Sequence, residues 1–252
     1  MAFTVGSLWV TLITIIAEKK GSVLGGILGG LPSTSAFSFF FIGVNQSTGV
    51  AVQATTVFPL AFGVTIAFLL FYAFFAQKGF GRGIGVSLFL WFAISALIVT
   101  SGIHDFTISL FAGAVISAVT YYCFTKKLKL ENLKGQTKVY STTDILLRGI
   151  GAGVLVMVAV LLSQVGGPEL GGIAASFPAV FTSTIVILNR SRGLEFSRSI
   201  TRPLVLSGIL TILPFCAAVR FLFPSLGVWL GTLAAYVLVV PLAILSYYIA
   251  GR

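Results

Sequence analysis

Two copies of a motif that contains glycine and proline, each followed by hydroxyl side chains, are the part of the sequence best suited to bind a ligand. The first copy reads GGILGGLP over residues 25–32, the second reads GGIAASFP over residues 171–178, and the two align without a gap. Both lie inside apolar stretches, where glycine and proline free backbone N–H and C=O groups that then need partners. Such groups can hold a solute in the middle of a membrane. The motifs therefore predict a binding site built from two interrupted helices.

The candidate ligands come from these motifs and from polar residues near them. The predicted substrate-binding residues are Gly29, Gly30, Pro32, Ser33, Thr34, Gln53, Thr56, Ser176, Pro178 and Thr182. Close helix packing is the alternative explanation for the glycines, because small residues let two backbones approach each other. A polar helix end at the membrane interface is the alternative for Gln53 and Thr56.

Glu169 is the candidate for ion coupling or gating. It stands between a Gly-Gly-Pro sequence at residues 166–168 and the second motif. A helix broken there would place the carboxylate at the mouth of a cavity, where it can bind a cation or a proton. An ordinary carboxylate in an outer loop or at a helix N-terminus is the alternative.

The two motifs differ just before their prolines, and the difference predicts different distortions. Glycine at positions 29 and 30 leaves the backbone free to depart from helical geometry, whereas Ala175 and Ser176 restrict it more. We therefore expect the first motif to be the more distorted and the second helix to be the straighter.

The sequence carries no pattern typical of an enzyme. It has one histidine and lacks a Cys/His metal spacing, a Gly-x-Ser-x-Gly elbow and a phosphate loop. We expect no catalytic residues, no metal and no cofactor. The net charge of +10 does not indicate nucleic acid, because the basic residues lie between apolar runs, as the positive-inside rule expects.

The elements that position these residues are membrane helices. The chain is 57% hydrophobic and only 9% charged, against roughly 25% charged in soluble domains. Apolar runs of about 20 residues recur along the whole chain. We predict an all-α polytopic membrane protein of about nine spans, in the cell (inner) membrane. The expected spans cover residues 4–17, 22–43, 50–77, 83–101, 106–124, 144–164, 170–188, 203–222 and 226–249.

Charge and repeat together predict the topology. Alternating the spans from an outside N-terminus to an inside C-terminus gathers almost every lysine and arginine on one side, with only Arg220 near the other. The motif helices then run in opposite directions. We expect a first repeat of five spans at residues 1–125, a basic cytoplasmic connector at 126–143, and a second repeat of four spans at 144–252, in inverted topology.

In this plan the chain resembles small inverted-repeat secondary transporters. The passage from Gly43 through Thr56 to Pro59 is similar to a pattern of the drug/metabolite transporter superfamily, in which a short turn leads into a helix with small and polar residues followed by proline. Members of that superfamily have ten helices with both termini inside, so this chain departs by one N-terminal helix. The resemblance carries over no binding residue.

We therefore predict a secondary transporter or exporter of a small solute, which works by alternating access where the two motif helices cross. An oligomeric channel or pore, and a membrane-embedded enzyme or lipid-handling scaffold, are the alternatives. The expected partners are a small molecule or ion, membrane lipids and, in an oligomer, further copies of the chain. Nucleic acid is not among them.

Overall fold

A computed structural model describes residues 1–19, 31–128 and 141–250 of the chain. It is 91% helical, with no strand in the described part. Six helical stretches are long and apolar enough to cross a membrane: Phe58–Lys78, Phe80–Thr100, Phe106–Leu128, Thr142–Gly166, Pro168–Arg192 and Leu194–Ile249. The predicted all-helical chain with several apolar helices is confirmed, and it fits a multi-pass integral membrane protein.

The helices form two groups, one on each side of residues 129–140. The first group is α1 (Ala2–Lys19), α3 (Ser33–Asn45), α4 (Thr48–Ala54), α5 (Phe58–Phe75) with a 3-10 turn at Ala76–Lys78, α6 (Phe80–Thr100) and α7 (Phe106–Cys123) with a π-helical turn at Phe124–Leu128. The second group is α8 (Thr142–Gly166), α9 (Pro168–Ala175), α10 (Ala179–Arg192), α11 (Leu194–Ser199) and α12 (Thr201–Ala250).

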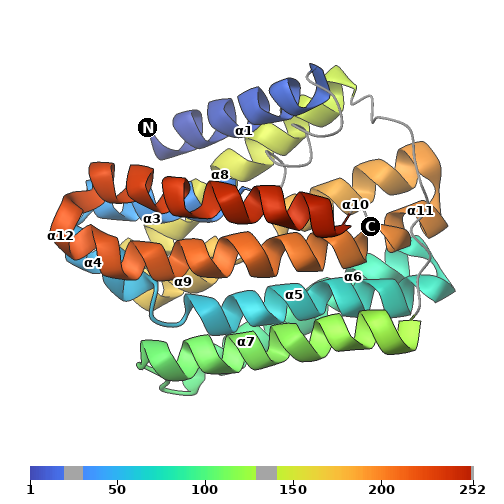
Figure 1. The fold of residues 1–252 in the computed structure, drawn as a ribbon, viewed down its shortest axis with the longest axis horizontal. Helices are drawn as coiled ribbons and strands as arrows, with labels where there is room; N and C mark the ends of the chain where they lie inside the picture. The colour runs from blue at the N-terminus through green and yellow to red at the C-terminus, as the bar shows by residue number, and fades with distance from the viewer. Residues whose placement is uncertain (20–30, 129–140, 251–252) are drawn as a thin grey trace.

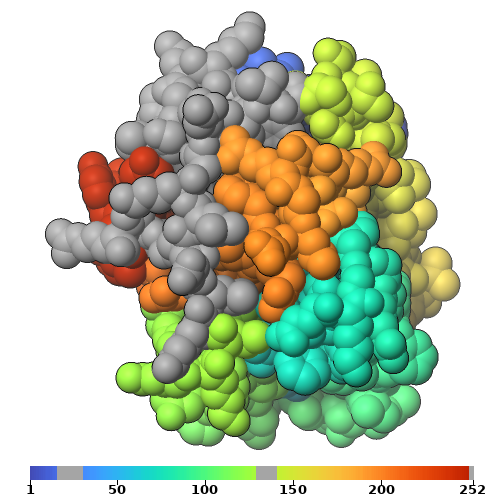
Figure 2. All heavy atoms as spheres, turned by 90° about the vertical axis from the view of Figure 1, so that its right-hand side faces the viewer, coloured from blue at the N-terminus to red at the C-terminus, as the bar shows by residue number. Residues whose placement is uncertain are grey.

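The long helices lie side by side along one axis of the molecule, so the bundle has two ends (Figure 1). One end holds the N-terminus and the short helix α4, and we call it the α4 end. The other holds α11 and the residues on either side of 129–140, and we call it the α11 end. Figure 2 looks at the α11 end, where α10 and α11 lie beside the turn between α5 and α6.

Three predicted boundaries are corrected by the structure. The predicted span 50–77 is divided into α4 and α5, because Pro59 lies in the first turn of α5, a position that favours a helix start. The predicted loop between residues 222 and 226 is helical, and the chain instead reverses at Gly227, whose φ of +70° suits glycine. Of the predicted span 22–43, residues 20–30 lie outside the described part, and α3 continues to Asn45.

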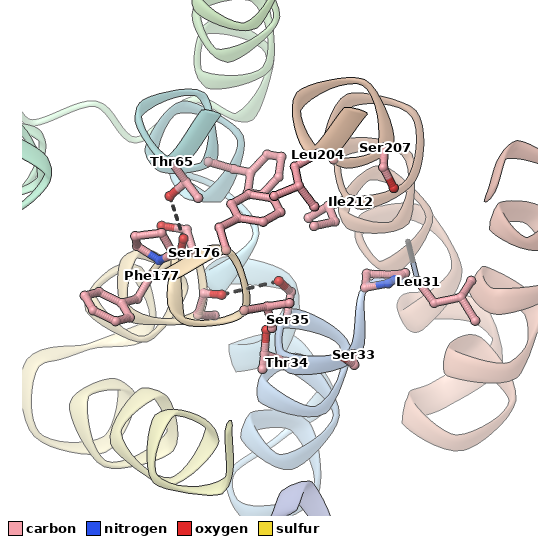
Figure 3. A pocket seen from close by; sticks show the side chains of 17 residues that line it. Leu31, Ser33, Thr34, Ser35, Thr65, Ser176, Phe177, Leu204, Ser207 and Ile212 are labelled. Atoms are coloured by element: carbon pink, nitrogen blue, oxygen red, sulfur yellow. Dashed lines mark hydrogen bonds between the residues drawn. The ribbon is translucent and has the colours of Figure 1, made fainter. Parts of the chain in front are cut away.

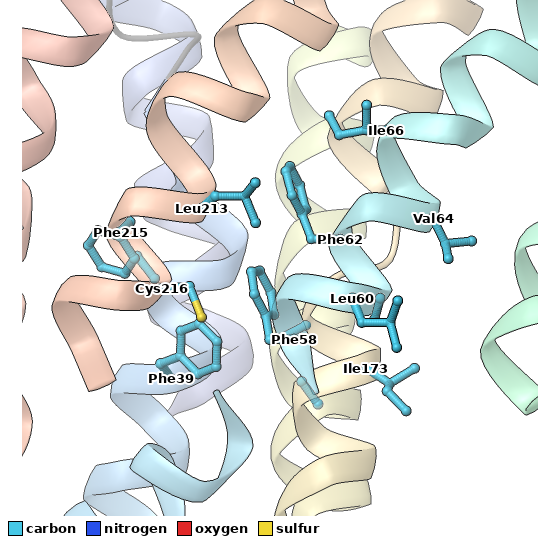
Figure 4. Packing of buried hydrophobic residues seen from close by; sticks show 14 of the residues in the cluster. Phe39, Phe58, Leu60, Phe62, Val64, Ile66, Ile173, Leu213, Phe215 and Cys216 are labelled. Carbon is cyan, nitrogen blue, oxygen red and sulfur yellow. The ribbon is translucent and has the colours of Figure 1, made fainter. Parts of the chain in front are cut away.

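Helix α5 forms the centre of the bundle and packs against α6, α7 and α12. The aromatic residues in its first half are buried: Phe58 stacks on Phe62 with ring centroids 5.8 Å apart and meets Phe39 of α3 edge-on at 4.9 Å. Figure 4 shows these rings beside Cys216 of α12. Because other helices pack around α5, the residues near its start are held in place.

The two short helices are tied across the bundle. At the α4 end, Arg220 of α12 donates from Nη1 to the Val52 carbonyl of α4 (3.0 Å). At the α11 end, Arg198 of α11 donates from Nε to the Ala73 carbonyl of α5 (3.0 Å). Each arginine thus neutralises part of the charge on a carbonyl in the last turn of a helix. The short helix of each group is therefore bound to a long helix of the other.

We predict that Gly113→Ala destabilises the fold, because α7 crosses α5 at this glycine. A methyl group there would overlap the Pro59 carbonyl oxygen, and rigid backbone cannot move aside cheaply. We expect a loss of about 2 kcal/mol, as for other overpacked sites, seen as a lower melting temperature in detergent. Gly85→Ala on α6 is the matched control, since a methyl group there meets open space. Equal melting temperatures for the two variants would contradict the crossing.

Candidate functional site

Both motif prolines lie in nearly the same turn. Pro32 has φ −74° and ψ 68°, and Pro178 has φ −75° and ψ 39°. The N–H of Ser33 donates to Leu31 O (2.8 Å), and the N–H of Ala179 donates to Phe177 O (2.8 Å), so each proline is the centre of a three-residue turn. A new helix starts directly after each, α3 in one case and α10 in the other.

The second motif helix, which we expected to be the straighter of the two, is itself broken at its proline, and the comparison with the first motif stays a prediction. Residues 176–178 separate α9 from α10, although alanine and serine precede the proline. Pro178 has no N–H to bond the carbonyl four residues earlier, and the residue before a proline is disfavoured in the helical region. These two effects outweigh the helical preference of Ala175. The corresponding Gly29 and Gly30 lie outside the described residues.

The carbonyl groups freed at the second break are bonded by hydroxyls of other helices. Ser35 of α3 donates to Ala175 O (3.3 Å), and Thr65 of α5 donates to Ser176 O (2.6 Å). Trp91 of α6 completes the chain by donating from Nε1 to the Thr65 hydroxyl (2.8 Å). The end of α9 is therefore bonded to α3 and α5 and, through Thr65, linked to α6 (Figure 3).

The Pro32 turn and the break at Pro178 face one cavity of about 40 Å³, which is room for roughly three water molecules. Ser33, Thr34 and Ser35 line it from the start of α3, and residues 175–178 line it from the break between α9 and α10. Helix α12 forms a further wall of the cavity, next to α3 and α5, with Leu204, Ser207 and Ile212 (Figure 3). The cavity is therefore shared between the two groups of helices.

Two helix N-termini supply the polarity of this cavity. Both α3 and α10 begin at its wall, and the first turn of a helix has unpaired N–H groups and a partial positive charge. Among the described residues, no ionisable side chain lines the cavity. A ligand with an oxygen acceptor suits such a wall. A cation does not, since no carboxylate there offsets its desolvation.

The predicted site residues fall into two sets. Pro32, Ser33, Thr34, Ser176 and Pro178 line the cavity, although whether they bind a substrate stays a prediction. Gln53, Thr56 and Thr182 do not line it. Gln53 is exposed, Thr56 is buried and accepts from Arg220 Nη1 at 3.2 Å, and Thr182 faces a different hollow beside α6. The Thr56 hydroxyl, at the break between α4 and α5, is therefore bonded to Arg220.

Glu169 lies at the α4 end, in the first turn of α9, and away from the cavity. Its carboxylate pairs with His104 Nδ1 at 2.6 Å, and both side chains are partly exposed, at 38% and 70%. Exposed pairs of this kind contribute little to stability. Its position therefore matches a helix N-terminal carboxylate, and it joins the α6–α7 loop to α9.

Two residues of the site were not predicted. Thr65 is the one serine or threonine within the apolar run of α5, and that isolation was the available signal. Nothing in the sequence marked Trp91 as a site residue, because its hydrogen-bond partner Thr65 lies on another helix. The glycines of the second motif serve packing: side chains at Gly171 and Gly172 would overlap Ser163 and the Ala54 carbonyl. For the second motif both interpretations therefore apply: its glycines allow close packing, and its helix is broken.

Comparison with known families, characterised proteins and solved structures finds no match to this chain. Within the described ranges, no group of three or more His, Cys, Asp or Glu side chains is placed to hold a metal ion. Fold and site together fit a helical membrane protein whose described cavity lining is uncharged and lies between the start of α3 and the break between α9 and α10.

We predict that Thr65→Val destabilises the protein more than a matched threonine change does. It removes the acceptor of Trp91 and the donor to Ser176 O, and a buried group left without a partner costs about 1–3 kcal/mol. Thr211→Val is the control, because Thr211 is fully buried but bonds only to its own helix at Ser207 O. Thermal unfolding in detergent measures both, and an equal loss would show that the Thr65 bonds contribute nothing.

Proposed function

We propose that this protein is a secondary transporter of a small solute and that the cavity at the two helix breaks is its binding site. The observation that carries the proposal is that Pro32 and Pro178 make the same turn and face one cavity from opposite groups of helices. Interrupted helices that meet near the middle of a bundle are the usual site of secondary transporters. The solute carries an oxygen acceptor for the two helix N-termini.

We propose nine spans in an inverted repeat of five plus four. Each group contains the same series: a long helix after the motif proline, a short helix, and a long helix with proline in its first turn. The series is α3, α4 and α5 with Pro59, and then α10, α11 and α12 with Pro203. The short helices of the two series lie at opposite ends of the bundle, which supports inversion (Figure 1).

We propose that the α4 end faces outside and the α11 end faces the cytoplasm of the cell (inner) membrane. Basic residues gather at the termini of elements that reach the α11 end: Lys78, Arg82, Lys126, Lys127, Arg190, Arg192, Arg198 and Arg202. The α4 end carries His104, Asp105 and Glu169. Positively charged loops stay in the cytoplasm, so this segregation supports an outside N-terminus and an inside C-terminus.

Alternating access then uses the ties at the two ends as gates. The outer tie is Arg220 on Val52 O and Thr56, with the pair of Glu169 and His104 nearby. The inner tie is Tyr72 on the Ser197 hydroxyl at 2.6 Å, with Arg198 on Ala73 O. With both ties closed the cavity is small, as observed. Opening one tie at a time would admit the solute from one side only.

We predict that weakening one tie shifts access to its own side. Ser207→Cys, in a chain with Cys123→Ser and Cys216→Ala, places one thiol at the cavity. A membrane-impermeant thiol reagent is then applied from either side of oriented vesicles. Tyr72→Phe should raise the labelling rate from the inside and lower it from the outside, by about fivefold for one lost hydrogen bond. Thr56→Val should do the reverse.

A control variant tests whether the effect of Tyr72→Phe depends on the position of the lost hydroxyl. Tyr248→Phe also removes a tyrosine hydroxyl, but from an exposed position on α12, and should leave both rates unchanged. Rates that rise together from both sides would identify a channel instead of a carrier. A thiol that stays inaccessible from both sides in all variants would refute transport through this cavity and favour an enzyme or scaffold.

A further inference from the structure

A second and larger hollow, of about 740 Å³, opens on the side of the bundle between α6 and α8, with α9 and α10 as its floor. We call it the lateral groove. Its walls carry the partly or fully exposed apolar side chains of Phe92, Val99, Val154, Val158 and Leu162. Its volume falls within the range of about 300–1,000 Å³ that is usual for ligand pockets. In a bilayer these walls face hydrocarbon.

The lateral groove also contains two hydroxyl groups without a partner. Ser95 of α6 is only 4% exposed, and neither its oxygen nor that of Thr182 on α10 has a hydrogen-bond partner among the described residues. Neighbouring hydroxyls behave differently: Ser87 bonds Gly83 O at 2.7 Å, and Ser183 bonds Val180 O at 3.0 Å. A buried hydroxyl without a partner costs free energy that a polar ligand group would recover.

The lateral groove and the central cavity share one lining residue. Phe177, at the break between α9 and α10, lines both. Its ring packs against Trp91, with centroids 5.0 Å apart, and against Phe92 at 5.7 Å. Trp91 is in turn bonded to Thr65, which also holds the carbonyl of Ser176. Phe177 therefore lies where the two hollows adjoin, at the break between α9 and α10.

We infer that the lateral groove binds the hydrocarbon chain of an amphipathic molecule from the bilayer, with its polar group at Ser95 and Thr182 beside Phe177. The apolar walls fit a chain, and the unpartnered hydroxyls fit a single small polar group at its end. No charged side chain lines the groove in the described part of the chain, so a polar solute from water would lose its hydration without compensation. The molecule is thus of lipid or fatty-acid type.

This inference deepens the proposed function, and it rests on that function in one respect only: the molecule in the lateral groove is taken to be the solute that passes Phe177 into the central cavity. The oxygen acceptor expected at the two helix N-termini and the polar group expected at Ser95 and Thr182 are then the same group.

Photolabelling tests the groove directly. The full-length protein, in vesicles of phosphatidylcholine, is exposed to a fatty acid that carries a diazirine on its chain, and labelled peptides are mapped by mass spectrometry. We expect labels to concentrate on α6, α8 and α9 residues of the groove, above the level on the exposed face of α7. Val158→Trp, which fills the groove, should abolish the excess, whereas Val119→Trp on that face of α7 should not.

Two further variants separate a site from ordinary lipid contact. Ser95→Ala combined with Thr182→Val should lower groove labelling by about tenfold, the loss expected for two hydrogen bonds. Ser183→Ala should leave it unchanged, because Ser183 lines the same groove but bonds its own helix. Groove labelling equal to that of α7, or unaffected by the double change, would overturn the inference. So would a crosslink from the groove to a second copy of the chain.

The outcome is independent of the transport test. Specific labelling of the groove combined with an inaccessible thiol at position 207 would keep the lipid site and refute the carrier. One-sided thiol access combined with uniform labelling would keep the carrier and refute a lipid-type solute.

Discussion

The carbonyl oxygens of Ala175 and Ser176 impose the constraint on which the centre of this structure depends. The chain leaves helical geometry at residues 176–178, and the N–H of Ala179 bonds Phe177 O instead of Ala175 O, while an apolar bundle offers no water in its place. An unsatisfied buried carbonyl costs about 1–3 kcal/mol. The hydroxyls of Ser35 and Thr65 meet this demand from two different helices. The end of α9 is therefore fixed against α3 and α5 by hydrogen bonds as well as by packing.

Close approach of backbones makes these bonds possible. Gly172 lies against the Ala54 carbonyl of α4, and Gly113 lies against the Pro59 carbonyl of α5, so neither position has room for a methyl group. Inside a membrane the hydrophobic effect does not drive one helix onto another, and small residues gain contact through proximity. The glycines position the helices, and the prolines then create the polar groups at their meeting point.

The sequence predicted the class of fold and part of the site for physical reasons that also explain the errors. Long apolar runs give helices, and the motifs at Pro32 and Pro178 led to the cavity, although proline alone is not decisive, since Pro214, Pro224 and Pro241 lie within α12. The division at residues 55–57 was missed because Thr55 and Thr56 are buried and do not interrupt the apolar run, which left Pro59 as the only signal. The bond between Trp91 and Thr65 could not be predicted, because periodicity within one helix carries no information about its neighbour.

The distribution of charge separates the central cavity from the ends of the bundle. Arg220, Arg198 and the pair of His104 with Glu169 all lie toward the ends of the bundle, while the described lining of the central cavity is uncharged. A cavity with such a lining can change its exposure without moving an ionised side chain through the apolar interior, a step that is expensive in a membrane.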